Sequence, residues 1–68
     1  MRNFVREKRE ALHLSQVKLS MMCGVSNGMI SEVELGKREA WPRLRKALAK
    51  ALVCNEEDIF PKEVNNDR

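Results

Sequence analysis

The sequence predicts an all-α fold, a single domain of five helices. Apolar residues recur at the spacing of a helix face in several segments, most clearly at Leu44, Leu48 and Leu52. Between these segments stand Gly, Pro, Ser and Asn residues, which are typical of helix ends and turns. The chain of 68 residues is also near the size at which one small core is only just sufficient, and a helical bundle is the economical way to build it.

Charge is distributed unevenly along the chain. Residues 1–50 carry eleven Lys and Arg against five Glu, a balance of +6, whereas residues 51–68 carry two basic against five acidic residues, a balance of −3. A basic body with an acidic end suits a polyanion-binding module, although a solvated charged surface gives the same balance. No apolar run approaches the ~18 residues that span a bilayer, and the charged segment of residues 1–10 is unlike a signal peptide. We therefore expect a cytoplasmic protein without a membrane segment.

The cysteine, histidine and serine residues offer few means of catalysis. Cys23 and Cys54 occupy apolar positions, which indicates reduced core thiols rather than a disulfide. With His13 they would be three metal ligands, but spacings of ten and thirty-one residues match no zinc pattern. The chain has one His, no Tyr and no glycine loop that would cradle phosphate. We expect no metal, no cofactor, no small-molecule ligand and no enzymatic activity.

The first helix is expected at about residues 3–12, with Asn3 as its cap. Its apolar stripe consists of Phe4, Val5, Ala11 and Leu12. Arg9 interrupts this stripe, and an arginine on a buried face is costly unless it meets a carboxylate. Glu34 lies on the buried side of the third predicted helix by helical spacing, so we predict an ion pair between Arg9 and Glu34.

The central stretch, residues 14–37, contains two short helices that meet at Gly24. Ser15 is placed to cap the first and Ser26 the second, because a hydroxyl just before an apolar-periodic run accepts unpaired amide hydrogens. Gly24 supplies the left-handed conformation that ends the first helix, and Ser20 is small where the two helices must touch. The apolar-periodic residues are Val17, Leu19 and Cys23 before the turn and Ile30 and Val33 after it, with Val25 at the joint.

Two further helices are expected after this stretch. Gly36 ends the third helix, and Pro42 fits the first turn of the fourth because its missing N–H would be unpaired there. The fourth helix carries an apolar stripe of Leu44, Ala47, Leu48, Ala51 and Leu52. Trp41 is expected to pack on the core. Asn55 caps a short last helix that Pro61 stops, which defines a domain of residues 1–61 and a tail of residues 62–68 that we expect to be disordered.

The central stretch resembles the helix-turn-helix of the phage Cro and repressor class, also called the XRE family. The matching positions are Gln16 at the helix start, Ser20 at the crossing, Gly24 at the turn, and the apolar residues Leu19, Cys23, Val25, Ile30 and Val33. The resemblance extends over roughly residues 4–60. It implies a lambda-repressor-like DNA-binding domain whose second and third helices form the helix-turn-helix. It also implies that the Arg9–Glu34 pair is structural.

The resemblance implies a sequence-specific regulator of transcription that binds double-stranded DNA, most simply as a repressor. A helix fits the major groove of B-DNA, where each base pair shows a distinct pattern of donors and acceptors. The recognition helix would comprise residues 26–35. With its apolar face and Glu34 committed to the core, the residues left for base contacts are Asn27, Gly28, Met29, Ser31 and Glu32. Of these, Asn27, Gly28 and Glu32 match the base-facing positions of the family.

The base-contact candidates differ in chemistry. The Asn27 amide can bond adenine on two edge atoms at once. Gly28 either lets the backbone approach a base closely or is unselected. Glu32 accepts from a cytosine amino group, repels phosphates in wrong registers, or is a solvated carboxylate. Met29 either contacts a thymine methyl group or packs at the rim.

Contacts to phosphates would supply much of the affinity. The candidates are Gln16, Ser26, Lys37, Arg38, Arg43 and Lys18. Because one small module reads few base pairs, we expect a symmetric homodimer on a roughly palindromic operator. One candidate dimer face consists of Cys54, Ile59, Phe60 and Val64, and the other of Val17, Met21 and Met22.

A protein-interaction module, such as the antitoxin of a toxin pair, is the alternative function. Its partner would bind the surface of Val17, Met21 and Met22, and a toxin or an anti-repressor is the kind of partner expected. Because such antitoxins often bind DNA as well, the two functions overlap and the sequence leaves both open.

Overall fold

The computed structural model describes residues 3–61, which contain five helices and no strand. In chain order the helices are α1 Val5–Ala11, α2 Gln16–Cys23, α3 Asn27–Glu34, α4 Pro42–Ala51 and α5 Glu56–Ile59. The prediction of an all-α fold of five helices is therefore confirmed. No helix in this part of the chain is long and apolar enough to cross a membrane. The predicted tail, residues 62–68, lies outside the described residues.

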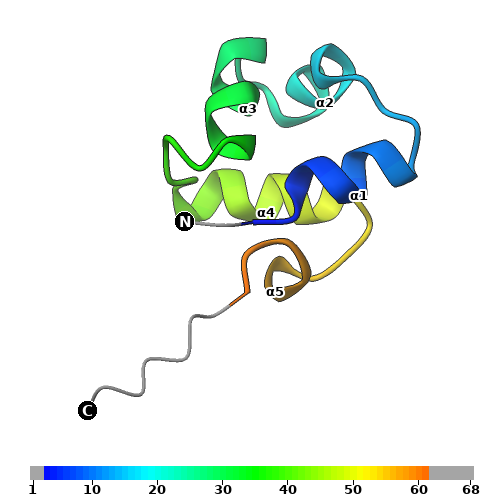
Figure 1. The fold of residues 1–68 in the computed structure, drawn as a ribbon, viewed down its shortest axis with the longest axis vertical. Helices are drawn as coiled ribbons and strands as arrows, with labels where there is room; N and C mark the ends of the chain where they lie inside the picture. Colours follow the sequence, from blue (N-terminus) through cyan, green and yellow to red (C-terminus); the bar gives the residue numbers. More distant parts are fainter. Residues whose placement is uncertain (1–2, 62–68) are drawn as a thin grey trace.

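Helix α4 is the central support of the bundle (Figure 1). Helices α2 and α3 lie on one side of α4 and α5 lies on the other, while α1 contacts α3. Every helix contributes to one core, whose members with at most 3% exposure are Val5, Leu19, Ile30, Val33, Leu44, Leu48, Leu52 and Ile59. Because α3 joins this core along one face only, its opposite face is free.

The starts of α2, α3 and α5 are capped by the residues that the sequence predicted. The Ser15 and Ser26 hydroxyls each accept a hydrogen bond from the amide three residues further on, at 2.9 and 3.1 Å. At the start of α5, the Asp58 carboxylate accepts from the Asn55 amide at 3.0 Å, which forms part of a capping box. These bonds satisfy amides that have no partner within the helix, so they fix where α2, α3 and α5 begin.

The first helix is shorter than predicted. Phe4, rather than Asn3, is the N-cap of α1. The Asn3 side chain instead accepts from the Val5 amide at 3.1 Å and donates through Nδ2 to the Val33 carbonyl at 2.8 Å, which fastens the start of α1 to α3. Helix α1 ends at Ala11, and Ala11 and Leu12 are exposed, so only the first part of the predicted apolar stripe reaches the core.

The prediction that Trp41 packs on the core is wrong. Its residue is 42% exposed, and Ala40, at 8%, takes the neighbouring core position. Trp41 is the N-cap of α4 and has extended backbone angles, φ −75° and ψ 163°. It therefore precedes the helix and does not share the apolar stripe that Leu44 begins.

Candidate nucleic-acid interface

The turn between α2 and α3 brings the two helices into close contact. Gly24 is the C-cap of α2, with φ 73° and ψ 29°, a left-handed conformation that a Cβ would penalise. Ser20 is 4% exposed at the crossing, and its hydroxyl donates to the Val17 carbonyl at 2.7 Å. A small side chain whose polar atom is paired internally allows the close approach. The structure thus confirms the turn that the sequence predicted.

Helix α3 has an apolar face in the core and a polar face in solvent. Ile30 and Val33 are 0% and 1% exposed and hold the helix against the bundle. Asn27, Gly28 and Glu32 are exposed on the other side. Three of the predicted base contacts are therefore accessible to a ligand, on a helix whose opposite face is packed in the core.

The two other predicted base contacts are less accessible. Met29 is half-buried and packs against the hydrophobic core. Ser31 is also half-buried, in a hollow that Arg6, Gln16 and Leu35 help to line. Of the two alternatives for Met29, this packing favours a residue at the edge of the core over a contact with a thymine methyl group.

A buried ion pair lies behind the exposed face of α3. Arg9 Nε donates to Glu34 Oε2 at 2.6 Å and Arg9 Nη2 donates to Glu34 Oε1 at 3.2 Å, so the predicted pair is present. Arg9 Nη1 also donates to the Leu14 carbonyl at 2.8 Å. Hydrogen bonding to Glu34 raises the pKa of the Arg9 guanidinium, and burial opposes this effect. With side chains 11% and 3% exposed, the pair ties α1 to α3.

Gln16, a predicted phosphate contact, is hydrogen-bonded to the Arg9–Glu34 ion pair. Gln16 Nε2 donates to Glu34 Oε1 at 3.0 Å, which joins α2 to the ion pair. A primary amide carries two N–H groups. In this arrangement, the second N–H of Gln16 and the backbone amides at the start of α2 are the donors left for a phosphate.

A second ion pair lies on the exposed side of the site. Arg38 Nε donates to Glu32 Oε1 at 2.8 Å, and the two side chains are 51% and 49% exposed. The structure therefore joins a predicted base contact, Glu32, to a predicted phosphate contact, Arg38. Half-exposed pairs of this kind contribute little to stability.

The predicted cationic phosphate contacts are exposed around α3. Lys18 lies on α2, Lys37 and Arg38 follow α3, and Arg43 lies in the first turn of α4. Arg43 shares a hollow with residues 23–25 of the turn, so the start of α4 lies beside the helix-turn-helix. Exposed positive side chains thus lie on α2, on the segment after α3 and on α4.

The arrangement matches a known family. A helix-turn-helix family model matches residues 5–59, which is most of the chain. The chain belongs to the Cro/repressor-like helix-turn-helix family.

The chain is also similar to individual proteins, both in sequence and in structure. The chain is 36% identical over 58 residues to two uncharacterised HTH-type transcriptional regulators, from two strains of Mycobacterium tuberculosis. That match covers 85% of this chain and 41% of each relative, so the chain spans about two fifths of their length. It is also similar to the solution structure of the DNA-binding domain of the P22 C2 repressor. The TM-score is 0.79 and the identity 31%, with 94% of this chain and 84% of that chain covered.

Within this helix-turn-helix domain, sequence reasoning missed the exposure of Trp41. Trp41 lines the hollow that it shares with Arg43 and the turn after α2. The available signal was its place directly before Pro42, because a proline in the first turn puts the preceding residue outside the helix. The ion pair between Glu32 and Arg38 was not predicted either, because the spacing of apolar residues does not predict the path of the segment after α3.

The predicted C-terminal dimer face is only partly available. Ile59 is 0% exposed and lies in the core, so its prediction as a contact with a second copy is wrong. Cys54 and Phe60 are half-buried and pack against the core. Val64 lies outside the described residues. The alternative face is more open, since Val17, Met21 and Met22 are 53%, 72% and 48% exposed on α2.

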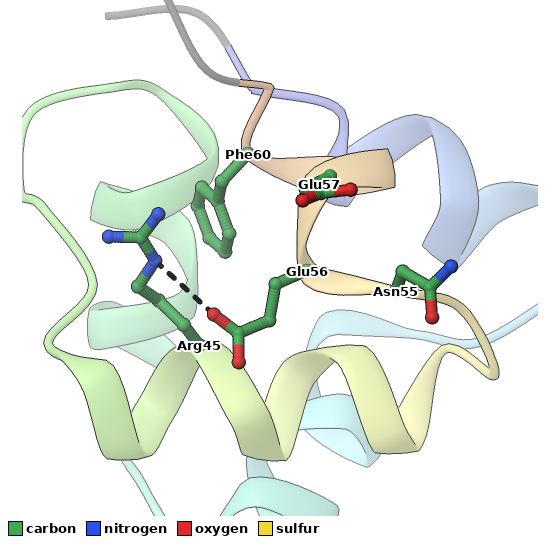
Figure 2. Close-up of a pocket in the computed structure, with 5 residues that line it drawn as sticks. All are labelled: Arg45, Asn55, Glu56, Glu57 and Phe60. Atoms are coloured by element: carbon green, nitrogen blue, oxygen red, sulfur yellow. Dashed lines mark ion pairs between the residues drawn. The ribbon is translucent and has the colours of Figure 1, made fainter.

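A hollow between α4 and α5 adjoins Phe60 (Figure 2). Arg45 Nε lies 3.9 Å from Glu56 Oε1, and the Arg45 guanidinium carbon lies 5.2 Å from the centre of the Phe60 ring. This pair joins α4 to α5, on the side of α4 away from α2 and α3.

Both thiols are free and partly buried. Burial raises the pKa of Cys23. Burial also raises the pKa of Cys54, with a further contribution from Asp58 and an opposing one from Lys8. Among residues 3–61 there is no group of three His, Cys, Asp or Glu side chains that could hold a metal ion.

Proposed function

We propose that the chain is a sequence-specific transcription regulator that binds double-stranded DNA, most simply a repressor, and that it recognises a palindromic operator as a homodimer. The observation that carries the proposal is the exposed face of α3, where Asn27, Gly28 and Glu32 stand on a helix held by buried residues. Similar proteins support it, since two relatives are named transcriptional regulators and the P22 domain is the DNA-binding domain of a repressor.

In this function α3 enters the major groove. The Asn27 amide bonds N6 and N7 of an adenine, and Gly28 allows the helix backbone to come close to the bases. Lys18, Lys37 and Arg43, together with the helix-start amides of α2, hold phosphates and set the register of the helix. A second copy doubles the number of base pairs read, so that the site becomes long enough to be specific.

Selection of bound duplexes from random double-stranded DNA tests the proposal. We expect enrichment of a two-fold symmetric sequence with half-sites about one helical turn, ~34–36 Å, apart. Sedimentation of the complex should show two chains on each duplex. A chain that enriches no sequence, and whose weak binding only falls with salt, would rule out a sequence-specific regulator.

A second candidate function is binding of a protein partner, as an antitoxin binds its toxin. The observation in its favour is the exposure of Val17, Met21 and Met22 on α2, because several large apolar side chains exposed on one short helix suit a protein interface. Replacement of Met21 by Glu, followed by sedimentation of the chain and the same DNA selection, tests this surface. Unchanged dimerisation and unchanged DNA binding would place the surface outside the DNA-reading function and leave it to a protein partner, whereas loss of the dimer would make it the contact with a second copy.

A further inference from the structure

We infer that Arg38, held by Glu32, reads a guanine in the major groove. In this assignment Glu32 is a positioning residue and does not itself contact a base. The inference rests on the proposed function, since it concerns how the same α3 surface recognises DNA. It begins from the hydrogen bond between Arg38 Nε and Glu32 Oε1, 2.8 Å long, on the exposed side of the helix-turn-helix.

The geometry of the pair leaves the right donors free. Arg38 uses Nε for Glu32, and within residues 3–61 neither of its Nη groups has a hydrogen-bond partner. Two parallel N–H groups on a planar guanidinium match the O6 and N7 acceptors on the major-groove edge of guanine. The carboxylate thus fixes the side chain while its reading end stays available.

The pair lies next to an open part of α3. Glu32 is four residues after Gly28, so both are on the same face of the helix. A Cβ added at Gly28 would meet only the Ser26 hydroxyl oxygen, at 4.0 Å, which shows that no side chain covers the helix there. Base edges can therefore approach the backbone beside the carboxylate that holds Arg38.

Electrostatics favour a base over a phosphate as the target. The Glu32 carboxylate offsets the positive charge of the guanidinium and itself repels phosphates. Lys37, the preceding residue, is exposed and forms no ion pair with any residue that the structure describes. Lys37 therefore suits a phosphate, whereas the Arg38–Glu32 unit suits a neutral base edge with two acceptors. Because the side chain is already held, less rotamer freedom is lost on binding.

The test is selection from random duplexes with the wild-type chain and the Arg38→Lys and Glu32→Gln variants. We expect the wild type to select a guanine at one position of each half-site. Arg38→Lys should lose that preference and keep the others, because an ammonium cannot bond two acceptors in parallel. The affinity for the guanine-containing site should fall roughly five- to 150-fold, while the affinity for random DNA is unchanged.

The second variant separates positioning from charge. Glu32→Gln should relax the preference at the same guanine, because the neutral amide holds the guanidinium less firmly. The matched control is Glu56→Gln, which removes the carboxylate of the Arg45 pair between α4 and α5 and should leave all base preferences unchanged. Circular dichroism before each selection establishes that the variant is folded.

Different failures are told apart by the same data. If Arg38→Lys keeps the guanine, or if Arg38→Ala weakens operator and random DNA equally and lowers the salt slope by about one, Arg38 holds a phosphate and the inference is wrong. A Glu32→Gln variant that keeps the full preference for the guanine would overturn it as well, because Glu32 would then not position Arg38. If the wild type selects no sequence, the proposed function fails, and the inference fails with it.

Discussion

At the scale of single residues, Arg9 and Glu34 form a buried ion pair inside a small helical bundle. Four hydrogen bonds hold the two side chains, which offsets the loss of hydration of both charges. We expect Arg9→Ala to lower the free energy of unfolding by about 3–5 kcal/mol, because the buried Glu34 side chain loses its main partner. Urea unfolding followed by circular dichroism measures the change.

A double variant provides the control for this prediction. Arg9→Met combined with Glu34→Leu removes both charges and keeps apolar volume, so it should be more stable than Arg9→Ala alone. If the double variant were less stable than the single one, the cost of an unpaired buried charge could not be the cause.

Val53 adopts a conformation that a β-branched residue rarely takes. Its φ is 55° and its residue is 81% exposed, just after the C-cap of α4. We expect Val53→Gly to raise the free energy of unfolding by about 1 kcal/mol, because glycine has no Cβ to strain there and no packed side chain is lost. Thermal and urea unfolding measure the gain. His13→Gly, at φ 58°, is the comparison and should gain less, since His tolerates this region better.

Particular residues show what the sequence can predict. The pair of Arg9 and Glu34 is predictable because each residue falls on the apolar side of a periodic segment, where a charge needs a partner. The pair of Glu32 and Arg38 has no such signal, since both are exposed and Arg38 lies beyond the helix. Trp41 was misplaced because hydrophobicity alone predicts burial, whereas the backbone before Pro42 directs the residue away from the core.

At the scale of elements, α3 contains a glycine in its first turn. Added at Gly28, a Cβ would be in ordinary contact, so Gly28→Ala should raise the free energy of unfolding by roughly 0.5–1 kcal/mol. In the proposed function the methyl group of the new alanine would lie between the helix backbone and the bases. Operator binding should therefore weaken although the free energy of unfolding rises. Urea unfolding and a binding titration of the selected duplex measure the two effects. Unchanged operator binding would mean that the position is unselected.

The helices themselves were predictable to within a few residues. Ser15, Ser26 and Gly24 specify the ends of α2 and α3 through local hydrogen bonds and backbone conformation, which are properties of the sequence nearby. The start of α1 is set instead by contacts with distant segments. Asn3 bonds the Val33 carbonyl, and the Phe4 amide donates to the Ile59 carbonyl at 2.8 Å, so the prediction from local pattern placed the helix start too early.

At the scale of the whole molecule, the two thiols make stability depend on pH. Burial raises the pKa of Cys23 and Cys54 above the ordinary 9.0. At pH values between the thiol pKa of the unfolded chain and the higher thiol pKa values of the folded chain, the unfolded chain has lost protons that the native chain keeps. The free energy of unfolding therefore falls as pH rises through this range. This contribution is complete below the ordinary pKa and is lost as pH rises through the folded pKa values.

Urea unfolding at about pH 7 and about pH 10 measures this effect. The variant with both cysteines replaced by alanine is the control, because other groups titrate in the same range. It should lose less stability than the wild type between the two pH values. An equal loss in both proteins would show that the thiols do not contribute.

The central claim is that the exposed face of α3 distinguishes one DNA sequence from others. The most direct measurement is the ratio of affinities for the selected duplex and a random duplex, by fluorescence anisotropy at physiological salt, for the wild type and Asn27→Ala. We expect the wild type to prefer the selected duplex by ~10³-fold or more, and Asn27→Ala to lose most of that preference while its affinity for random DNA stays the same. A wild-type ratio near one, or an equal loss on both duplexes in Asn27→Ala, would contradict the claim.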